Sequence, residues 1–156
     1  MNSDDESTRA LQVAIQTFVR TFGLLVTKQT PCGQPVSPSY AHALMILLDR
    51  QASGAVTTQG ALAIELGLDK SSIARLWARL EADDRVTQQR GEDGGRSRQL
   101  ELTARGRKMG TNIQDASLER FRRVTAALPS SKRRAVLESL ELLTAAVASL
   151  GAEEQT

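Results

Sequence analysis

The stretch from Thr57 to Thr103 constrains the fold more than any other part of the chain, because its apolar period changes within it. Two short segments with helical apolar spacing come first and are separated by Gly67. The segments RVTQQR and SRQLELT follow; both alternate in period two, and the turn residues GEDGG join them. We therefore expect two helices and then a β-hairpin, which is the order of a winged helix-turn-helix.

The two helices of this motif have recognisable ends in the sequence. Thr57 is expected to cap the first helix, which continues to Leu66, and Gly67 supplies the left-handed residue that ends it. Asp69 is expected to cap the second helix. The inward-facing residues are expected to be Leu62, Ala63, Leu66, Leu68, Ile73, Leu76 and Leu80. A plain helical hairpin would satisfy the same spacing, and the strands that follow favour the winged fold.

Apolar stripes on both sides of the motif predict further helices over about residues 7–29, 38–50, 104–127 and 131–150. The proline-rich segment TPCGQPVSP separates the first two, with Ser37 as the cap and Pro38 in the first turn of the second. Thr103 is expected to cap the long helix after the hairpin. The outermost stripes are Leu11, Ile15, Phe18, Phe22 and Leu25, and Val136, Leu140, Leu143, Val147 and Leu150. Their heptad-like spacing suits helix against helix, which indicates a homodimer; an intramolecular helix pair is the alternative.

Composition places the chain among ordinary globular proteins that are mainly helical. Its 156 residues, 40% of them hydrophobic and 3% aromatic, suffice for one folding unit with an aliphatic core. No apolar run approaches the roughly 20 residues of a membrane span, and the first residues, MNSDDESTRA, are acidic where a signal peptide is basic. We therefore expect a cytoplasmic protein without a membrane partner. The net charge of +2 permits nucleic-acid binding without requiring it.

Catalytic motifs are missing from the sequence. It contains no P-loop, dinucleotide-binding glycine motif, nucleophile elbow or metalloprotease signature. Cys32 is the single cysteine and His42 the single histidine, so a catalytic triad would need both of them. Two candidate ligands are also too few for a zinc site unless carboxylates of the first helix or of a partner subunit complete it. We expect no enzyme, no cofactor and no bound metal.

Taken together, these segments resemble a MarR family transcriptional regulator over nearly the whole chain. The likeness rests on SPSYAHALMILL, TTQGALAIELGLDKSSIARLWARLE and EDGGRSRQLELTARGRKM in this order and spacing. The third segment is the most specific, because it carries the family's acidic and basic wing and then Leu-Thr, Ala and Gly at a helix start. The resemblance implies one MarR-like domain over residues 1–156, with dimerisation helices at 7–36 and 104–150 and a winged helix-turn-helix at 37–103. It also implies a homodimer that binds double-stranded DNA at a palindromic operator and represses genes until a small ligand or an oxidant releases it.

The second helix of such a motif lies in the major groove with its N-terminal side chains at the base edges. Arg75 carries the fork that pairs with guanine O6 and N7, a contact that discriminates between bases by about 1–3 kcal/mol. The free amides and dipole that open the first helix attract phosphate, although simple capping explains the same residues. A solvated helix face is the plain alternative for the basic residues, and Arg79 is expected to reach phosphate or Asp83. The predicted contacts outside the wing are Thr57, Thr58, Gln59, Lys70, Ser71, Ser72 and Arg75.

The wing is expected to enter the minor groove, where the negative potential attracts guanidinium and glycines permit close approach. Arg96 is the predicted inserted residue, with Asp93 as its orienting acid by the family pattern. Arg90 and Arg98 flank the tip and are expected to meet phosphates. The doubled glycine of DGGR departs from tighter wings and leaves Arg98 as the alternative inserted residue.

Control of such a regulator is expected to involve a small aromatic or anionic ligand. Phe18, Phe22, Tyr40 and His42 are the candidates for its pocket by analogy, and they fit a hydrophobic core equally well. Cys32 lies outside the reactive-cysteine motif of peroxide-sensing members, yet a loop position permits oxidation, with a merely structural thiol as the alternative. Zinc-sensing members also use histidines on the helix after the wing, and this chain has none there.

Two other functional classes fit a winged helix. An architectural protein would bind DNA with a salt-dependent affinity and no preferred site. A protein-interaction winged helix would lack basic groups on its recognition face, and Lys70, Arg75 and Arg96 argue against it.

Overall fold

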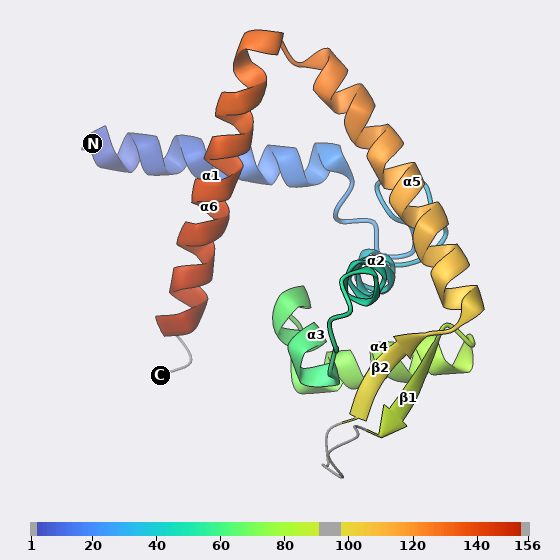
Figure 1. Cartoon of the computed structure of the whole chain (residues 1–156). Coiled ribbons are helices and arrows are strands. Elements are labelled where there is room, and N and C mark those ends of the chain that lie inside the picture. The colour runs from blue at the N-terminus through green and yellow to red at the C-terminus, as the bar shows by residue number, and fades with distance from the viewer. Residues whose placement is uncertain (1–2, 91–97, 154–156) are drawn as a thin grey trace. The chain divides into compact units, whose positions relative to one another are not determined.

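The computed structural model describes residues 3–90 and 98–153, and their main elements are helices and one antiparallel hairpin (Figure 1). This confirms the predicted winged-helix fold class. In chain order the elements are α1 (Ser3–Phe22), α2 (Pro38–Ala52), α3 (Gln59–Leu66), α4 (Lys70–Ala82), β1 (Val86–Arg90), β2 (Arg98–Leu102), α5 (Ala104–Ala127), the short 3-10 helix η1 (Ser130–Lys132) and α6 (Arg133–Glu153).

The chain divides into two compact units, Met1–Ser117 and Leu118–Thr156, and the boundary falls within α5. The first unit contains α1 to α4, the hairpin and the start of α5. The second contains the rest of α5, η1 and α6. The winged motif therefore lies entirely in the first unit.

The core of the first unit lies between α2, α3, α4, the hairpin and the first turns of α5. Leu44, Leu47, Leu62 and Leu80 are fully buried there, and Trp77 is 3% exposed. The remaining buried apolar residues are Val36, Tyr40, Ala41, Ala43, Ile73, Leu76, Val86, Leu100, Leu102 and Ile113. Of the inward-facing residues predicted for the two motif helices, Leu62, Ile73, Leu76 and Leu80 are buried and the others are half-buried.

Several helix ends follow the predicted chemistry. The Ser37 hydroxyl accepts a hydrogen bond from the amide of Tyr40 at 3.3 Å, with Pro38 in the first turn of α2. The Asp69 carboxylate accepts from the Ser72 amide at 2.7 Å at the start of α4. Gly67 ends α3 in the left-handed conformation, with φ of 63°.

Helix α1 ends earlier than the predicted limit near residue 29. Gly23 has φ of +89°, its amide donates to the Arg20 carbonyl at 3.2 Å, and the Leu24 amide donates to the Val19 carbonyl at 3.1 Å. This pair of bonds closes a helix on a left-handed glycine. The apolar period continues through Leu25, which is why spacing alone extended the helix too far.

The predicted cap of α3 is also wrong by one residue. Thr58 is the N-cap, and its hydroxyl accepts from the Ala61 amide at 3.2 Å. Thr57 instead continues the sheet, because its carbonyl accepts from the Leu100 amide at 2.9 Å and Thr58 forms a bridge with Gln99. The hairpin, paired from Val86 with Leu102 to Arg90 with Arg98, is thereby tied to the start of α3.

The junction between the hairpin and α5 is closely packed. The Thr103 hydroxyl accepts from the Gly106 amide at 2.9 Å, which confirms the predicted cap, and donates to the Asp84 carbonyl at 2.7 Å. The Thr103 amide donates to the Arg85 carbonyl at 3.0 Å. These bonds fix the start of α5 against the turn that follows α4.

The outer helices present apolar side chains at their surfaces. No described residue of α1 is buried, and Leu11, Ile15 and Phe18 are exposed. In the second unit Phe121, Val124, Leu140, Val147 and Leu150 are among the exposed apolar residues. Within residues 3–90 and 98–153, no helix has the length and hydropathy of a membrane span.

Candidate nucleic-acid interface

The N-terminal turns of α4 form a polar, accessible surface. Lys70, Ser71 and Arg75 are exposed and Ser72 is half-buried, whereas Ile73 and Leu76 on the opposite face are buried. The alternation follows from the 3.6-residue period, which turns one stripe of α4 toward the core and leaves the other in solvent. All four predicted contact residues of α4 are therefore brought to one accessible region.

Asp69 organises this surface through its carboxylate. Oδ1 accepts from the Ser72 amide at 2.7 Å and from the Ser71 hydroxyl at 2.8 Å, and Oδ2 accepts from the Ser72 hydroxyl at 3.1 Å. These hydrogen bonds lower the pKa of Asp69 to about 2. The bond from the Ser72 backbone amide has the largest effect, and the bonds from the two hydroxyls come next. The Ser72 hydroxyl in turn accepts from Nη2 of Arg75 at 3.2 Å. Asp69 was predicted only as a cap, and its hydroxyl partners were missed.

The start of α3 contributes less accessible surface than predicted. Thr57 is 2% exposed and its Oγ1 is buried without a hydrogen-bond partner, so this side chain does not reach solvent. Thr58 and Gln59 are half-buried, with the Thr58 hydroxyl engaged in the cap. A phosphate contact by Thr57 would have to use its backbone.

The tip of the wing, with the predicted contacts Asp93 and Arg96, lies outside the described residues. Arg90 and Arg98 are paired across the two strands by their backbones at the base of the tip. On the solvent face of the hairpin, the Gln89 amide donates to the Glu101 carboxylate at 3.0 Å.

At the other end of α4, Arg79 meets the acid predicted for it. Its Nε lies 3.8 Å from Oδ2 of Asp83, and its guanidinium lies 5.3 Å from the ring centre of Tyr40. The Tyr40 hydroxyl donates to the same carboxylate oxygen at 2.9 Å. Burial, followed by this hydrogen bond, raises the pKa of Tyr40, whereas the nearby Arg85 lowers it. The cluster joins the start of α2 to the end of α4.

The predicted pocket residues have different environments. Tyr40 is 1% exposed and belongs to the core, which is the alternative interpretation of its sequence position. His42 on the same helix is exposed. Phe18 and Phe22 stack on each other with ring centres 5.2 Å apart, and Phe18 is exposed. The half-buried Cys32 places its Sγ 3.0 Å from Oγ1 of Thr30. A ligand pocket built from these residues stays a prediction.

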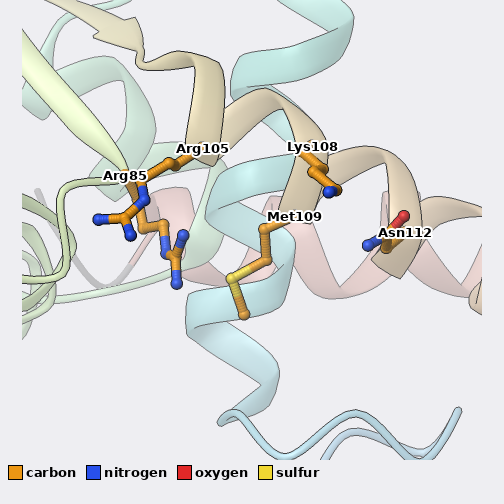
Figure 2. Close-up of a pocket in the computed structure, with 5 residues that line it drawn as sticks. All are labelled: Arg85, Arg105, Lys108, Met109 and Asn112. Atoms are coloured by element: carbon orange, nitrogen blue, oxygen red, sulfur yellow. The ribbon is translucent and has the colours of Figure 1, made fainter.

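A cavity of about 320 Å³ lies at the start of α5 and was not foreseen (Figure 2). Its lining consists of Arg85, Arg105, Lys108, Met109 and Asn112. The Nε atom of Arg85 is buried without a hydrogen-bond partner, and Arg105 reaches Asp84 only at 3.5 Å in an exposed pair. Among the described residues, three cationic side chains line this cavity and no acidic one does. The spacing of the α5 residues at positions 105, 108, 109 and 112 indicates one helix face, but nothing in the sequence indicates that Arg85 meets it.

Metal-ligating side chains are not gathered in the described part of the chain. There, no group of three or more His, Cys, Asp and Glu residues could hold an ion.

Comparison with known proteins finds similarity in structure but none in the searches by sequence. No protein-family model matches the sequence, and no curated protein matches it either. Solved structures do match. A probable transcriptional regulator from Pseudomonas aeruginosa is 21% identical with a TM-score of 0.64, and the match covers 91% of this chain and 99% of that chain.

Two further structures have stated ligands. MepR of Staphylococcus aureus, in a complex with DNA, is 15% identical with a TM-score of 0.63 over 94% of this chain and 99% of its own. The PcaV transcriptional regulator of Streptomyces coelicolor, in complex with its natural ligand, is 20% identical with a TM-score of 0.57 over 94% of each chain. These likenesses confirm the fold over nearly the whole chain.

Proposed function

We propose that this chain, whose fold is that of the MarR family regulators it resembles, is a sequence-specific DNA-binding transcriptional regulator. The observation that carries the proposal is the N-terminal surface of α4, where Lys70, Ser71 and Arg75 are exposed in a winged-helix fold. A helix in this position enters the major groove with its first turns at the base edges. The similarity to MepR, which was solved on DNA, supports this orientation.

The wing completes the proposed contact. Arg96 enters the minor groove with Asp93 as its orienting acid, while Arg90 and Arg98 meet phosphates on either side. The antiparallel pairing of Arg90 with Arg98 supports this arrangement, because it places the residues on either side of positions 91–97 next to each other. Thr58 and Gln59 attract a further phosphate, because they lie at the N-terminus of α3, where the helix dipole favours an anion.

The proposed active species is a homodimer on a palindromic operator. Exposed apolar residues on α1 and α6 support it, because monomeric proteins rarely leave contiguous apolar faces in water. A two-fold dimer places its two recognition helices on half-sites about one helical turn apart.

Repression by this dimer would end when a small ligand or an oxidant releases the dimer from its operator. The cavity beside Arg85, Arg105 and Lys108 supports a small organic anion as the ligand, because its charges are all positive and Met109 offers an apolar wall. Calorimetric titration of the protein with benzoate and with inorganic phosphate tests the cavity. We expect the wild type to bind one of these anions and Lys108→Gln to lose that binding. If Lys108→Gln binds the anion as well as the wild type does, the ligand binds outside this cavity.

Selection of binding sites from random duplexes, followed by fluorescence anisotropy over a salt series, tests DNA recognition. We expect a palindromic motif for the wild type, and for Arg75→Ala a loss of about 1–3 kcal/mol confined to one base position. Arg96→Ala should weaken binding through the minor groove. Arg79→Ala is the matched control, since Arg79 already contacts Asp83 and should not change the selected motif.

The same experiment separates the rival functions. Binding that falls steeply with salt but selects no motif would favour an architectural protein. No binding to any duplex would favour a protein-interaction winged helix.

A further inference from the structure

The carboxylate of Asp69 determines which way two hydroxyl groups at the start of α4 point. An ionised carboxylate only accepts hydrogen bonds, so the hydroxyls of Ser71 and Ser72, at 2.8 and 3.1 Å from it, must both donate. The Asp69 carboxyl stays ionised across the working range of pH, since its pKa is about 2. Both hydroxyl hydrogens are therefore directed inward, toward the cap.

A serine hydroxyl has one hydrogen to donate and two lone pairs to accept with. Ser71 in this arrangement offers two lone pairs to solvent. Ser72 offers one, because its other lone pair accepts from Nη2 of Arg75 at 3.2 Å. Neither hydroxyl has a hydrogen left for a phosphate oxygen, which only accepts. In the major groove the groups that donate are the amino groups of cytosine N4 and adenine N6.

We propose that Asp69 is a specificity-determining positioning residue, which makes Ser71 a hydrogen-bond acceptor that selects an amino-bearing base, cytosine or adenine. This inference rests on the proposed function, because it presupposes that α4 lies in the major groove. It reverses the expectation for a serine at a helix start, where donation to phosphate is the usual role. The negative charge of Asp69 acts in the same direction, since it disfavours a phosphate beside Ser71.

Asp69 also restrains Arg75 through the intervening Ser72. The chain of bonds from the carboxylate through the Ser72 hydroxyl to Nη2 of Arg75 holds the guanidinium over the first turn of α4. One guanidinium hydrogen is used in this way, and the other four remain for a bidentate contact with guanine. Loss of the Asp69 carboxylate is thus expected to weaken the preference of Arg75 for guanine as well.

The test compares binding-site selection by the wild type, Asp69→Gly, Ser71→Ala and Glu81→Gln at one salt concentration. Glycine at an N-cap costs only a few tenths of a kcal/mol, so Asp69→Gly keeps α4 while it removes the oxygen to which the Ser71 hydroxyl donates. Glu81→Gln removes the same charge from an exposed position near the other end of α4 and is the matched control. Thermal unfolding of each variant shows whether its fold is retained.

The wild type and Glu81→Gln should select the same motif, with cytosine or adenine at one position of each half-site. Ser71→Ala should lose this preference, by about tenfold against the other bases. Asp69→Gly should relax it and accept guanine or thymine there, because the Ser71 hydroxyl is then free to donate. An even loss of affinity for all sequences with Ser71→Ala would overturn the inference, because the hydroxyl would then meet phosphate. An unchanged motif with Asp69→Gly would also overturn it. If the wild type selects no motif, the proposed function itself fails.

Discussion

Gly106 is the position at which a single methyl group would conflict most directly with the fold. A Cβ built on this residue would lie 1.9 Å from the Arg85 carbonyl oxygen, far inside van der Waals contact and against backbone that cannot turn away. The start of α5 approaches the turn after α4 this closely because Thr103 bonds to both Asp84 and Gly106. Gly106 belongs to the segment EDGGRSRQLELTARGRKM, on which the resemblance to the MarR family partly rests. This close approach is a steric reason for a glycine at that position.

We expect Gly106→Ala to lower the free energy of unfolding by about 3 kcal/mol, the upper part of the range for overpacking. Urea unfolding followed by the fluorescence of Trp77, the single tryptophan and a core residue, measures it. Gly60→Ala is the matched control, because a Cβ at Gly60 meets nothing within 4 Å. It should be neutral or stabilise α3 by up to about 1 kcal/mol. Equal stability of the two variants would show that the Gly106 contact can relax.

Asp69 makes the free energy of unfolding depend on pH in the acidic range. Its pKa in the folded chain is about 2, below the 3.8 of an unperturbed aspartate, so the unfolded state binds the proton first as pH falls. The stabilisation from this carboxylate is therefore complete above about pH 4 and is lost as pH falls toward 2.

Carboxyl chemical shifts followed by NMR should give Asp69 a midpoint near 2. Asp69→Asn should reduce the fall in unfolding free energy between pH 4 and pH 2 relative to the wild type, since asparagine does not titrate. A midpoint near the ordinary aspartate value would contradict the hydrogen bonds described for Ser71 and Ser72.

At the scale of elements, four helices end on the same bonding pattern with a left-handed residue. Gly23, Gly54 and Gly67 serve α1, α2 and α3, and Asp84, with φ of 54°, serves α4. Aspartate tolerates this conformation better than most residues, yet the left-handed region still disfavours any side chain with a Cβ.

We expect the unfolding free energy to follow the order Asp84→Gly, wild type, Asp84→Ala, with about 1 kcal/mol between the two variants. Both variants remove the ion pair with Arg105, which is exposed and at 3.5 Å contributes little. Their difference in urea unfolding therefore isolates the backbone conformation. Equal stability of the variants would show that the turn after α4 is not strained at this residue.

The hydrogen bond from Tyr40 to Asp83 joins two elements that are far apart in sequence. Tyr40→Phe keeps the ring beneath Arg79 but removes the donor, and leaves the Asp83 carboxylate with one hydrogen-bond partner fewer. We expect a loss of about 1–2 kcal/mol in urea unfolding, as for hydrogen bonds to charged groups. Ser39→Ala, one residue earlier and half-buried, is the control and should cost less. A neutral Tyr40→Phe would mean that water replaces the hydroxyl.

Local chemistry explains which parts of this architecture were predictable. The caps at Ser37, Asp69 and Thr103 and the turn at Gly67 depend on residues within four positions, so the sequence displays them directly. The meeting of Tyr40 with Asp83, and of Arg85 with the face of α5, depends on how separate helices pack, and no local pattern records it. The same holds for Thr57, whose carbonyl pairs with Leu100 across the sheet and leaves the capping to its neighbour.

At the scale of the whole molecule, the exposed apolar residues of the outer helices bear on whether the chain is a monomer or a dimer. In the second unit, Leu137, Leu140, Leu142 and Val147 of α6 are 58%, 49%, 73% and 65% exposed. Burial of such side chains stabilises by roughly 1.5–3 kcal/mol each, so a helix with several of them in water favours association. The heptad-like spacing of the α6 stripe suits a partner helix, and a second copy of the chain is the proposed partner.

Sedimentation equilibrium tests this association. The wild type should have twice the chain mass of 16.9 kDa at micromolar concentration. Leu140→Asp should shift it toward the single-chain mass, because burial of an unpaired carboxylate in an apolar interface is costly. Ser139→Asp adds the same charge one residue away, at a position outside the apolar stripe, and should stay dimeric. Since each half-site then loses its linked neighbour, Leu140→Asp should also weaken binding to a palindromic duplex much more than to an isolated half-site. A wild type of single-chain mass would assign these apolar faces to contacts within one chain instead.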